Sequence, residues 1–101
     1  MADLLVQDGW SVLARNWRAV GGELDLVVER DGALRFVEVK ARAVGDDGLM
    51  ALTPSKRAKL RRAAEAWLVA HGPPRVEVCF LVAVVTVRAD GRAVEWLDDP
   101  W

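Results

Sequence analysis

The chain has 101 residues, which is enough for one domain with a single modest core and too few for two domains. Hydrophobic residues make up 52% and charged residues 29% of it, a balance typical of a globular protein and not of a disordered tail. The formal net charge of −1 excludes a global attraction to phosphate, so any nucleic-acid binding must come from local clusters of cations.

The first predicted element is a helix of one or two turns over residues 2–7, which Asp8-Gly9 end. This start lacks the basic segment and the apolar core of a secretory signal. The most apolar later run, residues 76–87, has only 12 residues and includes Glu77, so it is too short to span a bilayer. We therefore expect a cytoplasmic protein with no membrane partner.

Residues 10–18 predict a strand with an irregular end, which leads through two glycines into the next element. Trp10 and Trp17 are expected in the core or at a sheet edge and not as platforms for nucleobases. Arg15 and Arg18 flank the entry to the following acidic strand. They are candidates for phosphate contacts, and solvated charges that prevent edge pairing are the equal alternative.

Residues 22–30 and 33–42 predict a β-hairpin, because two runs rich in Val, Leu and Phe flank the pair Asp31-Gly32. A two-residue or four-residue loop centred on that pair fixes which residues oppose each other. The predicted pairs are Arg30 with Ala33, Val28 with Arg35, Leu26 with Val37, Asp25 with Glu38, and Glu23 with Lys40.

Alternation of side chains predicts one charged, partly apolar face of the hairpin and one apolar face. The charged face carries Glu23, Asp25, Val27, Phe36, Glu38 and Lys40. The apolar face carries Leu24, Leu26, Val28, Val37 and Val39.

Asp25 and Glu38 are thus expected opposite each other, with β-carbons roughly 4.5–5.5 Å apart. Two carboxylates at that separation repel unless a proton or a cation lies between them. The functional interpretation is a hard cation, Mg²⁺ or Mn²⁺, held by Asp25, Glu38 and the carbonyl of Val39, with Lys40 nearby. The alternative is an ordinary solvated face, on which Glu23 and Lys40 form a cross-strand ion pair.

A glycine-rich loop is expected over residues 43–52, where Asp46-Asp47 suits a turn better than a second metal site. Thr53 then caps a helix and Pro54 suits its first position. Apolar residues recur at helical spacing until residues 70–74 end the helix, so one face packs onto the sheet. His71 is expected to cap the helix end, where the dipole favours a cation.

The first turns of this helix hold the one local excess of positive charge in the chain. Its members are Lys56, Arg57, Lys59, Arg61 and Arg62. Such a cluster can neutralise phosphates of a nucleic-acid backbone, with an affinity that falls as salt rises. A solvated helix face is the alternative for the same pattern.

Residues 75–88 predict a long strand that is buried on both faces beyond Glu77, in the middle of the sheet. Cys79, the single cysteine, excludes an intrachain disulfide and a cysteine-based zinc site, and we expect it to be a buried structural thiol. Asp90-Gly91 predict a second hairpin turn, after which residues 93–97 return as a shorter strand.

Two segments of the predicted hairpin, GELDL at residues 22–26 and FVEVKAR at residues 36–42, resemble the signature of the YraN-like family. That family is related to Holliday-junction resolvases within the PD-(D/E)XK nuclease superfamily, and its members are expected to be endonucleases. Asn16 and Arg18 also match the Arg-Asn-x-Arg segment of the family, and Lys56 matches a lysine that opens its following helix.

The resemblance implies a role for each matching residue. Asp25 and Glu38 become the metal ligands, and Lys40 positions the attacking water or stabilises the developing charge. Glu23 becomes a further ligand or the ion-pair partner that holds Lys40 in place. The residues assigned to nucleic-acid binding are Arg15, Arg18, Arg42, Lys56, Arg57 and Lys59.

The resemblance also implies a restriction-endonuclease-like α/β fold, a mixed central sheet flanked by helices, within a single domain over residues 1–101. The strand after the long helix is expected beside the Glu38-Val39-Lys40 strand. Relatives usually start with a longer helix that carries a glutamate near the metal. This sequence does not include that segment, so the resemblance leads us to expect an N-terminal helix that is short relative to the family.

The implied activity is Mg²⁺- or Mn²⁺-dependent hydrolysis of phosphodiester bonds in branched or single-stranded DNA. Junction resolvases usually act as symmetric dimers, so a homodimer is the expected assembly, although no residue identifies its face. The alternative function is a non-catalytic nucleic-acid-binding or assembly module on a nuclease scaffold. A purely structural hairpin protein, which predicts no DNA binding at any salt concentration, is the third.

Overall fold

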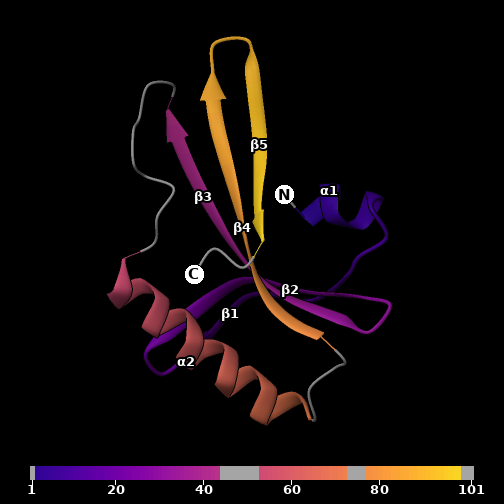
Figure 1. The fold of residues 1–101 in the computed structure, drawn as a ribbon, viewed down its shortest axis with the longest axis vertical. Coiled ribbons are helices and arrows are strands. Elements are labelled where there is room, and N and C mark those ends of the chain that lie inside the picture. Colours follow the sequence, from indigo (N-terminus) through magenta and orange to yellow (C-terminus); the bar gives the residue numbers. More distant parts are fainter. Residues whose placement is uncertain (1, 44–52, 73–76, 99–101) are drawn as a thin grey trace.

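The computed structural model describes residues 2–43, 53–72 and 77–98. Its elements follow the predicted order of a helix, three strands, a helix and two strands (Figure 1). They are α1 (Ala2–Gln7), β1 (Ser11–Ala19), β2 (Gly22–Arg30), β3 (Ala33–Ala43), α2 (Pro54–His71), β4 (Glu77–Arg88) and β5 (Gly91–Asp98).

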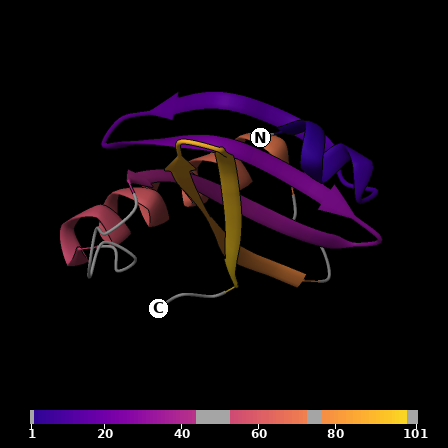
Figure 2. The same cartoon turned by 90° about the horizontal axis from the view of Figure 1, so that it is seen from above.

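The five strands form one mixed sheet in the order β1-β2-β3-β4-β5. All neighbours are antiparallel except β3 and β4, which pair in parallel from Ala33↔Glu77 to Ala43↔Val87. The strand after the long helix therefore lies beside the strand of Glu38 and Lys40, as predicted. This mixed α/β architecture is the fold class expected from the sequence, and Figure 2 shows how strongly its strands twist.

The core consists of two clusters, one on each side of the sheet. The cluster that packs under α2 contains Leu24, Val27, Leu34, Phe36, Leu60, Ala63, Ala64, Trp67, Val82 and Val84. The cluster that packs under α1 contains Ala2, Leu5, Trp10, Leu26, Val28, Val37, Leu81 and Ala83. In Figure 1, α2 runs along the β1–β2 part of the sheet, and the ends of β3, β4 and β5 project beyond it.

Local features explain where the elements turn and meet. Asp31 and Gly32 have φ values of 49° and 83°, and positive φ at both central residues suits a tight hairpin turn. The hydroxyl of Thr53 accepts a hydrogen bond from the Lys56 amide at 3.2 Å, which caps α2 as predicted. A Cβ at Gly22 would lie 2.3 Å from the carbonyl oxygen of Lys59, so only glycine lets α2 approach β2 this closely.

The burial prediction for β4 is only partly correct. Its middle, residues 81–86, is buried, but Val78 and Val87 near its ends are 36% and 51% exposed, and Cys79 is half-buried. The middle of this strand contributes residues to both clusters, which accounts for its burial. The predicted location of the tryptophans is confirmed, because Trp10 is buried and Trp17 packs at the edge of the α2 cluster.

Candidate active site

The predicted register of the central hairpin is confirmed from Arg30↔Ala33 to Leu26↔Val37. The backbone ladder ends there, so the predicted pairs of Asp25 with Glu38 and of Glu23 with Lys40 are not part of it. Beyond that point a side chain bridges the two strands. The Val39 amide of β3 donates a hydrogen bond to the Asp25 Oδ2 of β2 at 2.8 Å. Asp25 is therefore fixed at the gap where the two strands separate by a backbone group of β3.

Glu38 lies next to this gap and is only 8% exposed. Its Oε1 atom is 3.0 Å from the Nζ of Lys56, which comes from the first turn of α2. Burial raises the pKa of Glu38, and the negative charge of Asp25 raises it further, while the hydrogen bond and charge of Lys56 and the charge of Lys40 lower it. The two acids are thus close enough to interact electrostatically, and the net effect favours a proton or a cation at Glu38.

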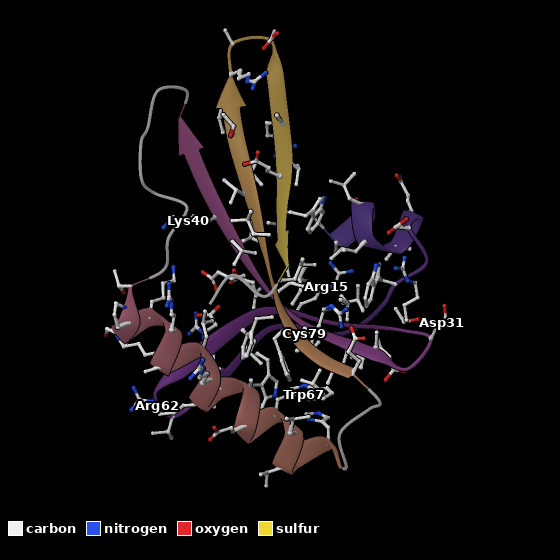
Figure 3. The ribbon with its side chains drawn as sticks, viewed as in Figure 1. Arg15, Asp31, Lys40, Arg62, Trp67 and Cys79 are labelled. Atoms are coloured by element: carbon white, nitrogen blue, oxygen red, sulfur yellow. The ribbon has the colours of Figure 1, made fainter. Side chains whose placement is uncertain are left out.

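Lys40, two residues further along β3, is half-buried. Figure 3 shows its side chain on β3 near the side of the sheet where α2 begins. Since its charge lowers the pKa of Glu38, the ammonium group lies within electrostatic reach of that carboxylate. The three residues predicted as catalytic, Asp25, Glu38 and Lys40, are consequently brought into one neighbourhood.

The predicted alternation of faces fails in the segment from Leu24 to Val27. Leu24 was expected on the face of Leu26 and Val28, but it packs in the α2 cluster with Val27 and Phe36. Residues three apart in a regular strand point to opposite faces. The strand is therefore irregular between Leu24 and Val27, which is the segment that carries Asp25.

Glu23 is not gathered with the other two acids. Its Oε2 lies 3.4 Å from the Nε of Arg18, its partner on β1, so the predicted pairing with Lys40 is replaced by this ion pair. Within residues 2–43, 53–72 and 77–98, no group of three or more histidine, cysteine or acidic side chains is placed to hold a metal ion. Asp25 and Glu38 are the two acids that remain as candidate ligands.

The cations predicted to bind nucleic acid fall into separate places. Arg15 lines a hollow of about 380 Å³ together with Asp25 and Asn16. Arg18 and Lys59 share a second hollow with Glu23, and Arg57 lines a third on α2. The side chain of Arg42 and the Asp46-Asp47 pair lie outside the described residues.

Two features of the site were not predicted from the sequence. Lys56 was expected to point toward a phosphate, but its ammonium group is the partner of Glu38. The cap at Thr53 places Lys56 in the first turn of α2, so the capping signal indicated its position but not its partner. Asn16, expected near the irregular end of a strand and as part of the Arg-Asn-x-Arg segment, has a φ of 46° in the left-handed region, and the sequence did not indicate that particular conformation.

The fold and the gathered residues define a small mixed α/β domain with two acids and two lysines where β2 and β3 separate, an architecture consistent with a nuclease-like core. The chain belongs to the uncharacterised protein family UPF0102, whose family model matches residues 1–88. This is the family that the hairpin motif resembles.

Curated relatives support the same membership. A UPF0102 protein of Rhodopseudomonas palustris is 47% identical over 70 residues, covering 69% of this chain and 54% of the relative. One of Methylorubrum extorquens is 45% identical over 87 residues, covering 86% and 62%. One of Roseiflexus castenholzii is 42% identical over 96 residues, covering 93% and 77%. The chain thus spans between half and two thirds of the first two relatives' lengths.

Among the described residues, neither helix has the length and the apolar character needed to cross a membrane.

Proposed function

We propose that the protein is a metal-dependent endonuclease that hydrolyses phosphodiester bonds in DNA, with Asp25 and Glu38 as ligands of Mg²⁺ or Mn²⁺. One observation carries the proposal: a buried glutamate with a raised pKa lies beside an aspartate that the Val39 amide holds in place. Folding two acids together is unfavourable unless a cation or a proton offsets their repulsion. Such pairs of acids are therefore concentrated at functional sites.

The donor set fits a hard divalent cation. Both acids offer carboxylate oxygens, and Mg²⁺ is commonly held by one or two carboxylates with water and substrate phosphates as its other ligands. When bound, the cation supplies charge stabilisation at the phosphoryl oxygens and lowers the pKa of a water molecule.

The other residues of the site act on the substrate and on the acids. Lys40 orients the attacking water or neutralises charge that develops on the phosphate. Lys56 holds Glu38 in place through the contact of 3.0 Å. Arg15, at the hollow beside Asp25, and the exposed Arg18 and Lys59 contact backbone phosphates of the DNA. Branched DNA cut on paired strands requires two such sites, so the proposal includes a homodimer.

A non-catalytic module that binds nucleic acid or assembles with a partner is the second candidate. The ion pair between Lys56 and Glu38 favours it, because it gives the buried acid a cationic partner from within the chain. Such a module would keep the fold and bind DNA without a metal ion.

A cleavage assay on duplex, single-stranded, flap and four-way-junction DNA, with Mg²⁺ or Mn²⁺, separates the two candidates. The nuclease proposal predicts cutting of at least one substrate, which EDTA abolishes and which Glu38→Gln reduces by about a hundredfold or more. Glu65→Gln, which alters an exposed acid on α2, is the matched control and keeps full activity. DNA binding measured by fluorescence anisotropy without any cleavage would establish the second candidate instead.

A further inference from the structure

In strands β1 and β2, the alternation of side chains between the two faces of the sheet is interrupted at one level, away from any turn. In β1, Ala14 and Trp17 both pack against the cluster under α2, and in β2, Leu24 and Val27 belong to that same cluster. The members of each pair are three residues apart, although a regular strand would direct them to opposite faces. The pairs are also cross-strand partners, Ala14↔Val27 and Trp17↔Leu24, so the facing of side chains changes at the same level in both strands, while the register stays constant from Ala14 to Ala19. The register shift between these strands lies earlier, between Val12 and Ala14.

This change in the facing of side chains coincides with Asn16. Its φ of 46° lies in the left-handed region, which among the described non-glycine residues is shared only by Asp31 in the hairpin turn. The register places Arg15 against Leu26 and Trp17 against Leu24, so Asn16 lies across from Asp25. Most L-residues avoid this region for steric reasons, and asparagine is one of the few that tolerate it.

The change of facing between Leu24 and Val27 determines the position of the Asp25 carboxylate. Regular alternation from Val27 would direct Asp25 into the cluster under α2. Instead, Asp25 lines the hollow that Arg15, Asn16 and Val39 also line, and its Oδ2 accepts the hydrogen bond from the Val39 amide. The irregular segment between Leu24 and Val27 therefore brings this carboxylate to the gap between β2 and β3.

We infer that Asn16 is a positioning residue, whose left-handed backbone carries the Asp25 carboxylate to the Val39 amide and so prepares it to bind a metal ion. The metal-binding part of this inference rests on the proposed function. The positioning of the carboxylate does not, because the hydrogen bond to Val39 exists in the protein alone.

Two substitutions at Asn16 separate its backbone conformation from its side chain. Asn16→Gly and Asn16→Ala both remove the amide group, but glycine adopts positive φ readily and alanine does not. Asp31→Gly and Asp31→Ala form a matched control pair, since Asp31 has nearly the same φ of 49°. Figure 3 shows Asp31 at the outer tip of the β2–β3 hairpin, away from the site.

The readouts are hydrogen exchange of the Val39 amide, measured by NMR, and affinity for Mn²⁺, measured by titration calorimetry. We expect Asn16→Gly to keep both within about threefold of the wild type, and Asn16→Ala to speed exchange and weaken Mn²⁺ binding by about tenfold each. The Asp31→Ala protein loses global stability but keeps its Mn²⁺ affinity, and its Val39 amide loses no more protection than neighbouring amides of the sheet.

The inference is overturned if Asn16→Ala keeps both properties, or if Asp31→Ala weakens Mn²⁺ binding as much as Asn16→Ala does. If Asn16→Ala does not fold, Asn16→Gly decides, because loss of Val39 protection in that protein would show that the backbone conformation alone does not position Asp25. A wild-type protein that binds no Mn²⁺ would refute the proposed function, while exchange at Val39 would still test the role of Asn16.

Discussion

The two halves of the β2–β3 hairpin differ in how their strands are held together. In the outer half, from Leu26↔Val37 to the Asp31-Gly32 turn, backbone hydrogen bonds join the strands in a regular ladder. In the inner half, the hydrogen bond from the Val39 amide to Asp25 joins the two strands, and Glu38 of β3 forms an ion pair with Lys56 of α2. The outer half of this hairpin is thus held by backbone hydrogen bonds, whereas the inner half carries the charged side chains of the site.

This difference indicates how a small sheet can hold two acids close together. A continued ladder would leave the Val39 amide unavailable to the Asp25 carboxylate, since an amide that points toward β2 would pair with a backbone carbonyl of that strand. Where the strands separate, the amide of Val39 becomes available as a donor, and a carboxylate accepts from such a donor more strongly than a neutral group does. Irregular structure at this point therefore gives the Asp25 carboxylate a backbone donor.

The largest expected effect comes from removing the charge of Asp25 while keeping its hydrogen bond. In Asp25→Asn, the amide oxygen can still accept from Val39, so the fold should persist, but the site loses one anionic ligand. We expect Mn²⁺ affinity and DNA cleavage to fall by about a hundredfold or more. Titration calorimetry and the cleavage assay measure the two losses.

Asp31→Asn in the outer half is the matched control for this change. Asparagine followed by glycine suits the same turn, so this protein should bind Mn²⁺ and cleave DNA as the wild type does. Equal activity of Asp25→Asn and wild-type protein would mean that the inner half has no catalytic role.

The second effect tests how the inner half is supported by α2. Gly22→Ala would place a Cβ 2.3 Å from the Lys59 carbonyl oxygen and 3.2 Å from the Cβ of Ala63, so α2 must move away from β2. We expect a loss of about 1–3 kcal/mol in the free energy of unfolding, measured by urea denaturation. Because Lys56 belongs to the same helix, its contact with Glu38 should weaken as well.

Gly91→Ala gives the contrast, because a Cβ at Gly91 meets no atom within 4 Å and its cost comes only from the φ of 136°. We expect it to lower stability without changing the pKa of Glu38, which NMR titration of its side-chain carboxyl can follow. A Gly22→Ala protein as stable as the wild type would show that the helix contact does not constrain the inner half.

The outer half of the hairpin was predictable from the sequence, and the inner half was predictable only in part. Asp31-Gly32 fixed the turn, and the turn fixed the register up to Leu26 and Val37 through local geometry. The interrupted alternation at Asn16 involves packing of β1 and β2 against α2, so the alternation of apolar and polar residues in the sequence does not indicate it. The nearness of Asp25, Glu38 and Lys40 was expected, but the partners that hold the acids, Val39 and Lys56, became visible only in the structure.

The smallest expected effect is a dependence of stability on pH that belongs to the inner half. Burial, followed by the charge of Asp25, raises the pKa of Glu38 in the folded protein above its ordinary value, although Lys56 and Lys40 oppose this. The folded state therefore binds the Glu38 proton more tightly than the unfolded state does. The contribution of Glu38 to stability falls as pH rises from its ordinary pKa to its raised pKa, and it is constant outside that window.

Glu38→Gln should remove this fall, since glutamine does not titrate. The measurement is the free energy of unfolding by urea at a series of pH values, taken as the difference between wild type and variant so that other titrating groups cancel. Lys56→Met should have the opposite effect, because loss of its hydrogen bond leaves the pKa of Glu38 higher and widens the window. Identical pH profiles for wild type and Glu38→Gln would mean that the buried carboxyl does not differ from a solvated one, and the inner half would then lack the electrostatic character that distinguishes it from the outer half.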